Sequence, residues 1–258
     1  MTEKTSMPKN KKADQYNDPN HNYLKYWQGR DYEHEAEVLA IKRLLKNKKF
    51  KLAVDIGGGY GRLDPLLAKY AEKVVLAEPS QQQLDMAKDF LAEMPGVSQK
   101  LMQADDLKFE SGSVDLAVMI RVMHHLPDPT ESFDEISRVL IPGGYAIIEV
   151  ANYMHAKNRL KYFLKGKKLP TEPVDIRSKE HQGKDEIAFV NHNPHTVIAQ
   201  LAKSGLSVNR ILSVSNLRYP GLKKVVPKPV MLAIEGILQP VLSSTFFGPS
   251  IFFLVVKS

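Results

Sequence analysis

A glycine-rich turn follows the first strongly apolar run of the chain. In VDIGGGYGRL, Asp55 is followed by Gly57, Gly58, Gly59 and Gly61. Glycines at such a turn let the backbone come close to a ligand and adopt positive φ angles. The first N–H groups of a helix that follows the turn have no partner within that helix and can bind a ligand. The turn therefore predicts a binding site for a metabolite.

The spacing of these glycines separates two kinds of cofactor site. The dinucleotide fingerprint G-x-G-x-x-G would begin at Gly57 and Gly59 and requires a third glycine at position 62, where the chain has Arg62. The pattern of a nicotinamide dinucleotide site is therefore incomplete, because its third glycine is missing. A tight turn between a strand and a helix that binds no ligand is the remaining alternative at this stage.

An acidic residue ends the next apolar run. Glu78 lies 23 residues after Asp55, in KVVLAEP. An acid about 20 residues after the glycine turn, at the tip of the second strand, is placed to accept hydrogen bonds from both hydroxyls of a ribose. The alternative is a solvated carboxylate at a strand end. Together with the glycine turn, Glu78 favours a ligand that contains a ribose.

Two later segments complete a pattern that is typical of one family. DLKFESGSVDLAVMIRVMHHLPDP and RVLIPGGYAIIEV contain an Asp that opens an apolar run (Asp115), the sequence His-His-Leu (residues 124–126) and a Pro-Gly-Gly turn (residues 142–144). With D-x-G-x-G-x-G and Glu78, the chain resembles the class I S-adenosylmethionine (SAM)-dependent methyltransferases, in particular the small-molecule group of ubiquinone and menaquinone methylases. The resemblance implies a methyltransferase whose cofactor is SAM, whose product is S-adenosylhomocysteine and which uses no metal.

The resemblance also assigns roles to the residues of the glycine turn. It implies that Gly57 and Gly59 pack under the methionine part of SAM, with Gly58 and Gly61 in the same turn. Asp55 would orient the amino end of the methionine.

Further cofactor contacts are implied beyond the turn. Glu78 would hold the ribose and Pro79 would border the adenine. The family usually places an acid at the position of Gln103 to bind the adenine amino group. This departure leaves the adenine partner open among Ala104, Asp105 and Asp106.

The residues after the expected fourth strand are candidates for catalysis. Arg121 stands where family members place a residue beside the cofactor, and His124 and His125 follow it. Imidazole titrates near neutral pH and commonly acts as a general base. The alternative is that one histidine is a buried, hydrogen-bonded family feature and that the other contacts the cofactor or solvent. Because the sulfonium of SAM already activates the methyl group, a general base is optional.

An aromatic cluster precedes the first expected helix. Tyr26, Trp27 and Arg30 lie in YLKYWQGRDYEHEAEVLAIKRLL, residues 23–45. In related small-molecule methyltransferases such an N-terminal helix covers the cofactor and helps to form the acceptor pocket, so these three residues are candidates for substrate binding. The alternative is that the rings anchor the helix to the edge of the sheet.

No metal site is expected. The chain has no Cys, which excludes thiolate ligands, disulfides and cysteine nucleophiles. His192 and His195 lie close together around Pro194, but no cluster of carboxylates accompanies them. A capped helix start with polar histidines accounts for this pair better than a metal does.

The elements that position these residues alternate along the chain. Near-continuous apolar runs occupy residues 51–57, 73–79, 114–120 and 144–150, with a weaker run at 98–104. Helix-like segments lie between them, at about 62–71, at 80–93 with Ser80 as the expected N-cap, and at 129–140. Such runs are typical of parallel strands that are covered on both faces. We therefore expect an α/β fold with a doubly wound, mostly parallel sheet. The resemblance implies seven strands in a Rossmann-like methyltransferase arrangement, with an antiparallel C-terminal strand.

Three sections are expected along the chain. Residues 1–45 form an N-terminal tail and cap helix, residues 46–152 the SAM-binding α/β core, and residues 153–258 the C-terminal half of the sheet. This last section contains two insertions, at about 153–190 and 217–249, either of which can form a lid over the acceptor.

The formal net charge of +7 is unevenly distributed. Residues 51–150 hold 9 Lys and Arg against 16 Asp and Glu, whereas residues 151–258 hold 16 against 6. The basic charge therefore serves an acceptor, a surface or solubility rather than the cofactor. The absence of Cys and of an apolar N-terminal signal segment predicts a cytoplasmic protein. Prolines and charges interrupt the apolar stretch 225–256, which therefore cannot span a membrane.

The expected acceptor is a small molecule. The chain lacks the N-P-P-Y/W signature of adenine or amide nitrogen methylation, and the absence of Cys removes the C5-pyrimidine route. One alternative is an RNA methyltransferase, suggested by the basic runs KNKK (46–49) and LKGKK (164–168). Others are a SAM-binding regulatory protein without turnover and peripheral contact of residues 227–242 with a membrane or a lipid-like acceptor.

Overall fold

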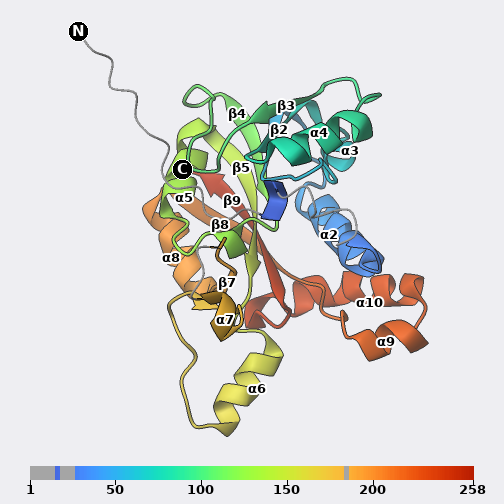
Figure 1. Ribbon diagram of the computed structural model, residues 1–258, viewed down its shortest axis with the longest axis vertical. Helices are drawn as coiled ribbons and strands as arrows, with labels where there is room; N and C mark the ends of the chain where they lie inside the picture. Colours follow the sequence, from blue (N-terminus) through green and yellow to red (C-terminus); the bar gives the residue numbers. More distant parts are fainter. Residues whose placement is uncertain (1–14, 18–26, 183–185) are drawn as a thin grey trace.

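The computed structural model describes residues 15–17, 27–182 and 186–258, and one seven-stranded sheet lies at its centre (Figure 1). The strands lie in the order β3-β2-β1-β4-β5-β9-β8. Their bounds are Phe50–Ile56 (β1), Ala71–Glu78 (β2), Val97–Leu101 (β3), Val114–Met119 (β4), Leu140–Ala151 (β5), Leu206–Val214 (β8) and Ser250–Lys257 (β9). A separate two-stranded pair consists of Val174–Asp175 (β6) and Val190–Asn191 (β7).

The strand directions confirm the expected doubly wound sheet. The strands β1 to β5 pair in parallel, whereas β9 runs antiparallel to both of its neighbours, β5 and β8. Consequently β8 points the same way as β5. The chain leaves β1 towards β3 on one side and returns to β4 on the other side. Ligands of open α/β sheets bind at such a switch point, outside the carboxyl ends of the strands.

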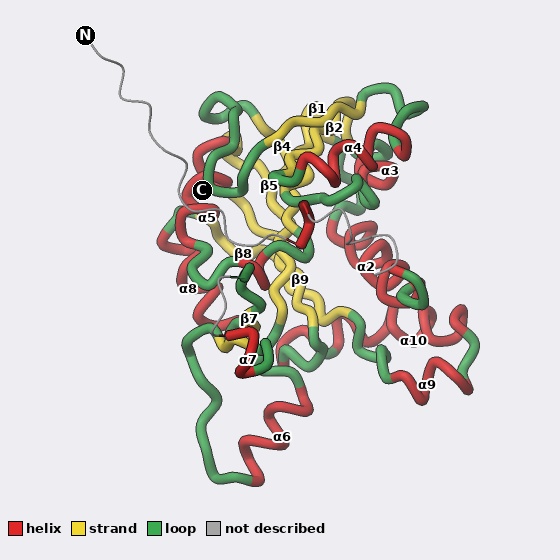
Figure 2. The backbone as a smooth tube through the Cα atoms, viewed as in Figure 1, coloured by secondary structure: helices red, strands yellow, loops and turns green. Residues whose placement is uncertain are grey.

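Helices cover both faces of this sheet (Figure 2). They are Asp31–Leu44 (α2), Asp64–Leu67 (α3), Gln81–Phe90 (α4), Thr130–Val139 (α5), Pro194–Lys203 (α8) and Lys228–Val241 (α10). On one face α2 and α10 pack in a core with Ala53 and Leu116, and on the other face α5 and α8 pack with Val54 and Ala117. Consecutive strand residues thus enter two different cores, which explains the near-continuous apolar runs.

The loops after β1 and β2 differ in how they enter their helices. At α4 the expected N-cap is present, because the Ser80 hydroxyl accepts the backbone N–H of Gln83 at 3.2 Å. The helix expected over residues 62–71 is reduced to the four residues of α3. The chain must already rejoin the sheet at Tyr70, whose carbonyl accepts the N–H of Phe50 at 2.9 Å.

The C-terminal section leaves the sheet twice, at the carboxyl ends of β5 and β8. The first excursion contains Ala156–Leu164 (α6) and Lys179–Gln182 (α7), and the second contains Pro220–Val225 (α9), α10 and the 3-10 turn Ser243–Thr245 (η3). In the second excursion α10 packs against α2 and β8. Within the described residues, no helix, α10 included, is long and apolar enough to cross a membrane.

Candidate functional site

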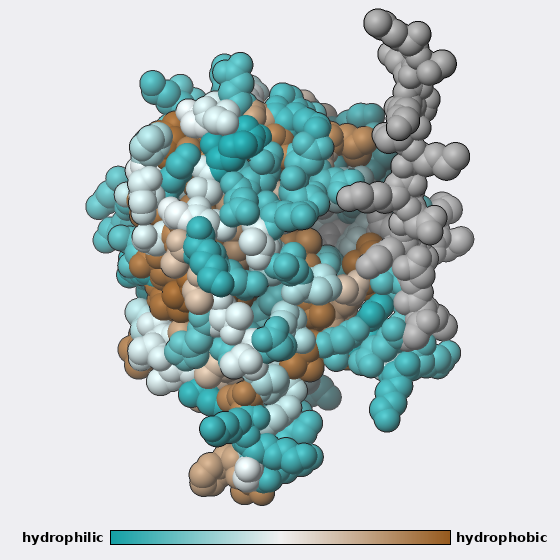
Figure 3. Space-filling model, turned by 90° about the vertical axis from the view of Figure 1, so that its left-hand side faces the viewer, coloured by the Kyte–Doolittle hydropathy of each residue, from teal (hydrophilic) through white to brown (hydrophobic). Residues whose placement is uncertain are grey.

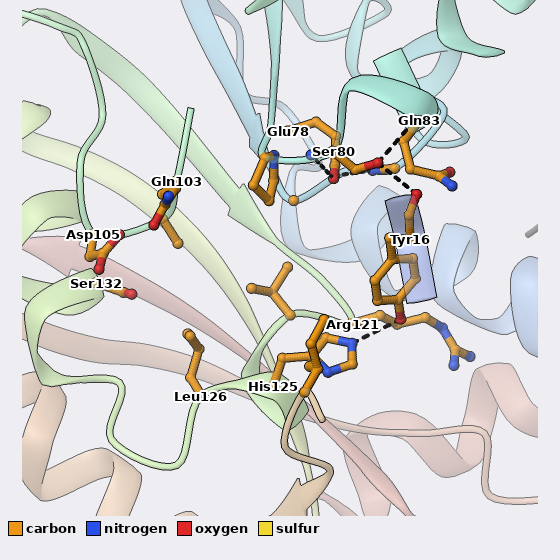
Figure 4. A pocket seen from close by; sticks show the side chains of 16 residues that line it. Tyr16, Glu78, Ser80, Gln83, Gln103, Asp105, Arg121, His125, Leu126 and Ser132 are labelled. Atoms are coloured by element: carbon orange, nitrogen blue, oxygen red, sulfur yellow. Dashed lines mark hydrogen bonds between the residues drawn. The ribbon is translucent and has the colours of Figure 1, made fainter. Parts of the chain in front are cut away.

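A cavity of about 240 Å³ lies at the carboxyl ends of β1, β2 and β4, at the switch point of the sheet (Figure 4). Its walls include four segments that follow strands: the glycine turn after β1, the loop between β2 and α4, the segment after β3 and the segment after β4. The residues predicted to bind the cofactor that line it are Gly57, Gly59, Glu78, Pro79, Ala104, Asp105 and Arg121. The fold thus brings together residues that are spread over 65 positions of the sequence.

The glycine turn approaches the cavity through its backbone. Gly57 and Gly59 have φ angles of 64° and 63°. A Cβ atom on Gly57 would lie 2.5 Å from Cγ2 of Val122. Gly58 faces away from the cavity, and a Cβ atom there would lie 2.4 Å from Oδ2 of Asp55. Side chains are therefore excluded from both faces of the turn.

Glu78 joins two of the loops that form the cavity. Its Oε2 accepts the backbone N–H of Gly59 at 2.9 Å, and its Oε1 accepts the N–H of Ser80 at 2.9 Å. Each carboxylate oxygen can accept more than one hydrogen bond, and Glu78 lines the cavity. The geometry of Glu78 is therefore compatible with hydroxyl donors from a ligand, while the same side chain fixes the glycine turn.

The segment after β3 forms the opposite wall. Gln103 and Asp105 line the cavity, and Ser132 of α5 lies beside them (Figure 4). Asp106 lies outside the lining, is exposed to solvent and forms an ion pair with Lys108. Gln103, Asp105 and Ser132 are thus the polar side chains of this wall, and the first two belong to the segment after β3.

A tyrosine that the sequence did not single out faces the candidate base His125 (Figure 4). Tyr16, in the 3-10 turn Gln15–Asn17 (η1), places its hydroxyl 2.9 Å from Nε2 of His125. Ser80 holds this turn by donating its hydroxyl to the Tyr16 carbonyl at 2.7 Å. Nδ1 of His125 lies 3.0 Å from the carbonyl oxygen of Ala188. Because a carbonyl only accepts, the proton is assigned to Nδ1, and Nε2 accepts from Tyr16.

The neighbouring candidate, His124, lies outside the lining of the cavity. Its ring packs against the rings of His125 and Phe189, with centroid distances of 3.9 and 4.7 Å. Burial, followed by the charges of His125 and Arg121, lowers the pKa of His124 well below its ordinary value. The His124 imidazole is therefore neutral at physiological pH.

A buried ionic cluster supports Arg121 beside the glycine turn. Glu37 of α2 accepts from Arg62 at 2.7 Å and from Arg121 at 2.6 Å. The guanidinium carbons of Arg62 and Arg121 lie 3.7 and 4.7 Å from the centroid of the Trp27 ring. Burial alone would raise the pKa of Glu37, but the charges of Arg121 and Arg62 outweigh it and lower the pKa. The cluster therefore holds a fixed anion between two cations.

The first acid of the glycine motif lies behind the turn, outside the larger cavity. Asp55 and Asp64 are 1% and 0% exposed. Among the described residues, Oδ2 of Asp55 and both carboxylate oxygens of Asp64 have no N–H or O–H donor. Burial raises the pKa of Asp55 to about 7, and burial together with the charge of Asp55 raises the pKa of Asp64. Two such carboxyl groups can share one proton. Gly61 packs against this pair, with a Cβ position 2.8 Å from Oδ2 of Asp64.

The residues predicted to bind the substrate differ in their relation to the two cavities. Trp27 lines a smaller cavity of about 20 Å³ that shares Gly57 and Arg121 with the larger one. Arg30 lines neither cavity, and its backbone N–H donates to the carbonyl of Trp27 at 3.1 Å. Tyr26 lies outside the described residues.

The second histidine pair does not come together. His192 is buried and donates from Nε2 to the carbonyl of Met123 at 2.9 Å, whereas the ring of His195 packs against Phe246 at 4.9 Å. In the ranges that the structure describes, no three His, Asp or Glu side chains gather where they could hold a metal ion.

Several residues of the cavity were not predicted from the sequence. They are Tyr16, Ser80, Gln83, Gln103, Val122, Leu126, Ser132 and Ile187. Tyr16 is held by residues that lie 64 and 109 positions away in the sequence. It carries no local signal, because its segment has neither a motif nor an apolar period. Ser80 was recognised as a helix cap, and that position also brings it to the cavity.

Comparison with known proteins identifies the family of the central section. Residues 54–148 match a family model described as a methyltransferase domain. A putative methyltransferase of Dictyostelium discoideum is 36% identical over 102 residues, which are 40% of this chain and 37% of that protein. Tocopherol O-methyltransferase, chloroplastic, of Arabidopsis thaliana is 31% identical over 127 residues, 44% of this chain and 36% of that protein. The chain thus spans well under half the length of these curated relatives.

Solved structures resemble nearly the whole chain. A SAM-dependent methyltransferase of Thermotoga maritima, titled a possible histamine N-methyltransferase, has a TM-score of 0.64 and 19% identity, covering 92% of this chain and 95% of that one. A putative SAM-dependent methyltransferase of Listeria monocytogenes has a TM-score of 0.61 and 18% identity, covering 88% and 99%. At such identities the likeness shows the fold alone.

Proposed function

Since residues 54–148 belong to the class I SAM-dependent methyltransferase family, we propose that the chain transfers a methyl group from SAM to a small-molecule acceptor. The observation that carries the proposal is the position of Glu78, which bonds the backbone of the glycine turn and lines the same cavity. An acid beside a glycine turn at the switch point of the sheet suits a ligand that contains a ribose.

The residues of the cavity fit the parts of SAM. Glu78 would accept from the ribose hydroxyls, and Pro79 would border the adenine. Gln103 or Asp105 would bind the adenine amino group from the opposite wall. The backbone of Gly57, which has no room for a side chain, would lie under the methionine part.

We propose that Tyr16 and His125 act as one proton-accepting pair. SAM supplies an activated methyl group on its sulfonium, so the protein mainly aligns the acceptor, excludes water and takes up a proton. An acceptor hydroxyl or amine would give its proton to the Tyr16 oxygen as the Tyr16 proton passes to Nε2 of His125. The imidazolium formed would keep donating from Nδ1 to the carbonyl of Ala188, which favours the charged form.

The first insertion is the better candidate for the acceptor lid. Its residue Ile187 lines the cavity, and the carbonyl of Ala188 orients His125. The second insertion places α10 against α2 and β8, and none of its described residues belongs to the cavity lining. The prediction that residues 217–249 form a lid therefore has less support than the same prediction for residues 153–190.

A small acceptor is supported by the composition of the cavity. The apolar side chains of Val122, Leu126 and Ile187, which line it beside the residues assigned to SAM, suit a small molecule better than a polymer. One of the curated relatives, tocopherol O-methyltransferase, carries a name that refers to a small acceptor.

Calorimetric titration with SAM and S-adenosylhomocysteine tests the cofactor site. The wild type is expected to bind both, and Glu78→Ala is expected to weaken binding by at least about tenfold through the loss of charge-assisted hydrogen bonds. The exposed Glu72, at the start of β2, gives the matched control Glu72→Ala, which should bind normally. A folded wild type that takes up neither compound would overturn the proposal.

Turnover tests the proton-accepting pair. With an acceptor found by release of S-adenosylhomocysteine, Tyr16→Phe is expected to lower kcat by about 100-fold with unchanged SAM affinity. A Tyr16→Phe enzyme with full kcat would exclude the pair. SAM binding without turnover of any acceptor would favour a regulatory protein instead.

A further inference from the structure

The helix α6 extends from the body of the molecule (Figure 1). None of its residues is buried. We call residues 157–168, which comprise most of α6 and the basic loop after it, the α6 tip. Because the tip adds nothing to either sheet core, its composition is not explained by folding.

Large apolar side chains of the α6 tip face solvent. Leu160, Phe163 and Leu164 are 59%, 80% and 75% exposed. Their spacing of three and four positions puts them on neighbouring parts of one helix face. An aromatic ring and two leucines on a protruding helix bury apolar area only when something covers them.

The same segment is strongly basic. Residues 151–170 contain six Lys and Arg and no Asp or Glu. Five of these are Lys157, Lys161, Lys165, Lys167 and Lys168 of the α6 tip. Within the described part of the chain, the side chains of these lysines form no ion pair. Apolar side chains and cations therefore alternate along the protruding α6 tip.

We propose that the α6 tip docks on the surface of an anionic lipid bilayer. Lysines beside such a surface are attracted by its negative potential, and Phe and Leu side chains enter the boundary between headgroups and acyl chains. RNA would satisfy the lysines but would leave Leu160 and Leu164 exposed, because an aliphatic side chain offers bases no stacking face. An acidic protein would need a groove for the apolar side chains, whereas a bilayer accepts them without a matched shape.

The position of the tip relates the bilayer to the cavity. The chain enters α6 from the carboxyl end of β5, and the cavity opens at the carboxyl ends of β1, β2 and β4, which run parallel to β5. At the lower end of Figure 3, where α6 lies in Figure 1, hydrophobic and hydrophilic residues stand next to each other. Docking would therefore bring the bilayer to the sheet edge that carries the cavity.

Vesicle co-sedimentation of the full chain tests this docking and requires no methyl transfer. Vesicles of phosphatidylcholine alone are compared with vesicles that contain about one third phosphatidylglycerol, at low salt and at about 1 M salt, where charges are screened beyond about 3 Å. Binding is expected only to the anionic vesicles and only at low salt. An absence of binding to anionic vesicles at low salt would overturn the proposal.

Matched variants separate the tip from the rest of the surface. Leu164→Ser should weaken vesicle binding roughly tenfold, whereas Leu101→Ser, at a 58% exposed leucine of β3, should leave it unchanged. Lys165→Gln with Lys168→Gln should weaken it about 25-fold, and the exposed pair Lys46→Gln with Lys73→Gln should not. Thermal unfolding checks that every variant is folded.

Two further results would contradict the proposal. One is vesicle binding that the α6 variants leave unchanged. The other is single-stranded RNA binding, measured by fluorescence anisotropy, that is tighter than vesicle binding and is lost in the Lys165→Gln, Lys168→Gln variant but retained in Leu164→Ser.

Discussion

Two carboxyl groups beside the glycine turn are buried equally, but their pKa values are shifted in opposite directions. Glu37 of α2 and Asp55 of β1 are each 1% exposed. Burial would raise both pKa values. At Glu37 the charges of Arg121 and Arg62 outweigh burial and lower the pKa, whereas at Asp55, beside the carboxyl group of Asp64, burial prevails and raises the pKa to about 7. The partner, rather than the degree of burial, therefore decides whether a carboxyl group at this turn is charged.

The surroundings of these two carboxyl groups support the cavity in different ways. Glu37 fixes Arg121, which lines the cavity, through an ion pair. At Asp55 the support comes from close packing, because Gly58 lies directly against its carboxyl group. A charged anchor on one side and a packed, proton-sharing pair on the other keep the turn in one conformation.

The largest effect is expected from removing the charge of Glu37. Glu37→Gln should lower the free energy of unfolding by about 3 kcal/mol, because two largely buried guanidinium groups lose the counter-charge that Glu37 provides. Urea denaturation at neutral pH measures it, with Glu93→Gln, at an exposed residue, as the control within about 0.5 kcal/mol of wild type. A loss below about 1 kcal/mol would mean that the arginines are stabilised without Glu37.

Packing at the Asp55 region is tested by Gly58→Ala. The new Cβ atom would lie 2.4 Å from Oδ2 of Asp55 and 2.6 Å from Leu76, so unfolding should require about 2 kcal/mol less free energy. Gly236→Ala, in α10, is the control, because the new Cβ atom would lie at an ordinary contact distance of 3.5 Å from its nearest neighbour, Leu39 of α2. This control should be neutral or stabilising by up to about 1 kcal/mol. Equal unfolding midpoints for the two variants would contradict the packing argument.

The ionisation of the Asp55–Asp64 pair is tested by pH. Because burial raises the pKa of Asp55 to about 7 in the folded state, its contribution to stability is complete below about pH 4 and is lost as the pH rises to about 7. In Asp64→Asn the amide N–H can donate to the Asp55 carboxylate and favour its charged form. The variant should therefore be about 1.5 kcal/mol more stable than wild type at pH 8 and similar at pH 4.

Denaturant unfolding across this pH range provides the measurement for Asp64→Asn. Asp106→Asn, at an exposed position, should follow the wild-type pH profile. A parallel profile for Asp64→Asn would show that the pair does not share a proton.

The smallest effect on stability is expected from changing the shape of the Arg62 side chain while keeping its positive charge. Arg62→Lys keeps the positive charge beside Glu37 but loses the planar stack 3.7 Å from the Trp27 ring, which should cost about 1 kcal/mol. Arg210→Lys, at an exposed residue of β8, should stay within about 0.5 kcal/mol of wild type. Equal losses of stability in the two variants would show that the contact between Arg62 and the Trp27 ring does not stabilise the protein.

Most of the central sheet could be predicted because its signals are local. The strands β1, β2, β4 and β5 are apolar runs, and the Ser80 cap is a single residue before a helix. The cavity-lining positions of Gly57, Glu78 and Arg121 follow from motifs that place them at strand ends.

Other parts of the site depend on contacts that no local pattern contains. Of the two adjacent histidines, His125 lines the cavity and His124 does not. Both lie in the same 3-10 turn, so the sequence gives no signal for which ring points into the cavity. In α10 the polar residues Glu235 and Gln239 are buried and Ile237 is exposed, which reverses the usual arrangement of a surface helix. The reversal arises because Glu235 accepts the hydroxyl of Tyr32, 203 positions earlier in the chain.

By itself the sequence determined the α/β class, the glycine turn and the sheet edge at which a nucleoside-like cofactor would bind, because apolar runs and glycine spacing act over a few residues. Only the tertiary structure decided which polar groups meet: Tyr16 with His125, Glu37 with two arginines, and Asp55 with Asp64. Partners such as Tyr16 and His125 lie far apart in the sequence, so packing chooses them. Their charge states follow from the partner that packing provides.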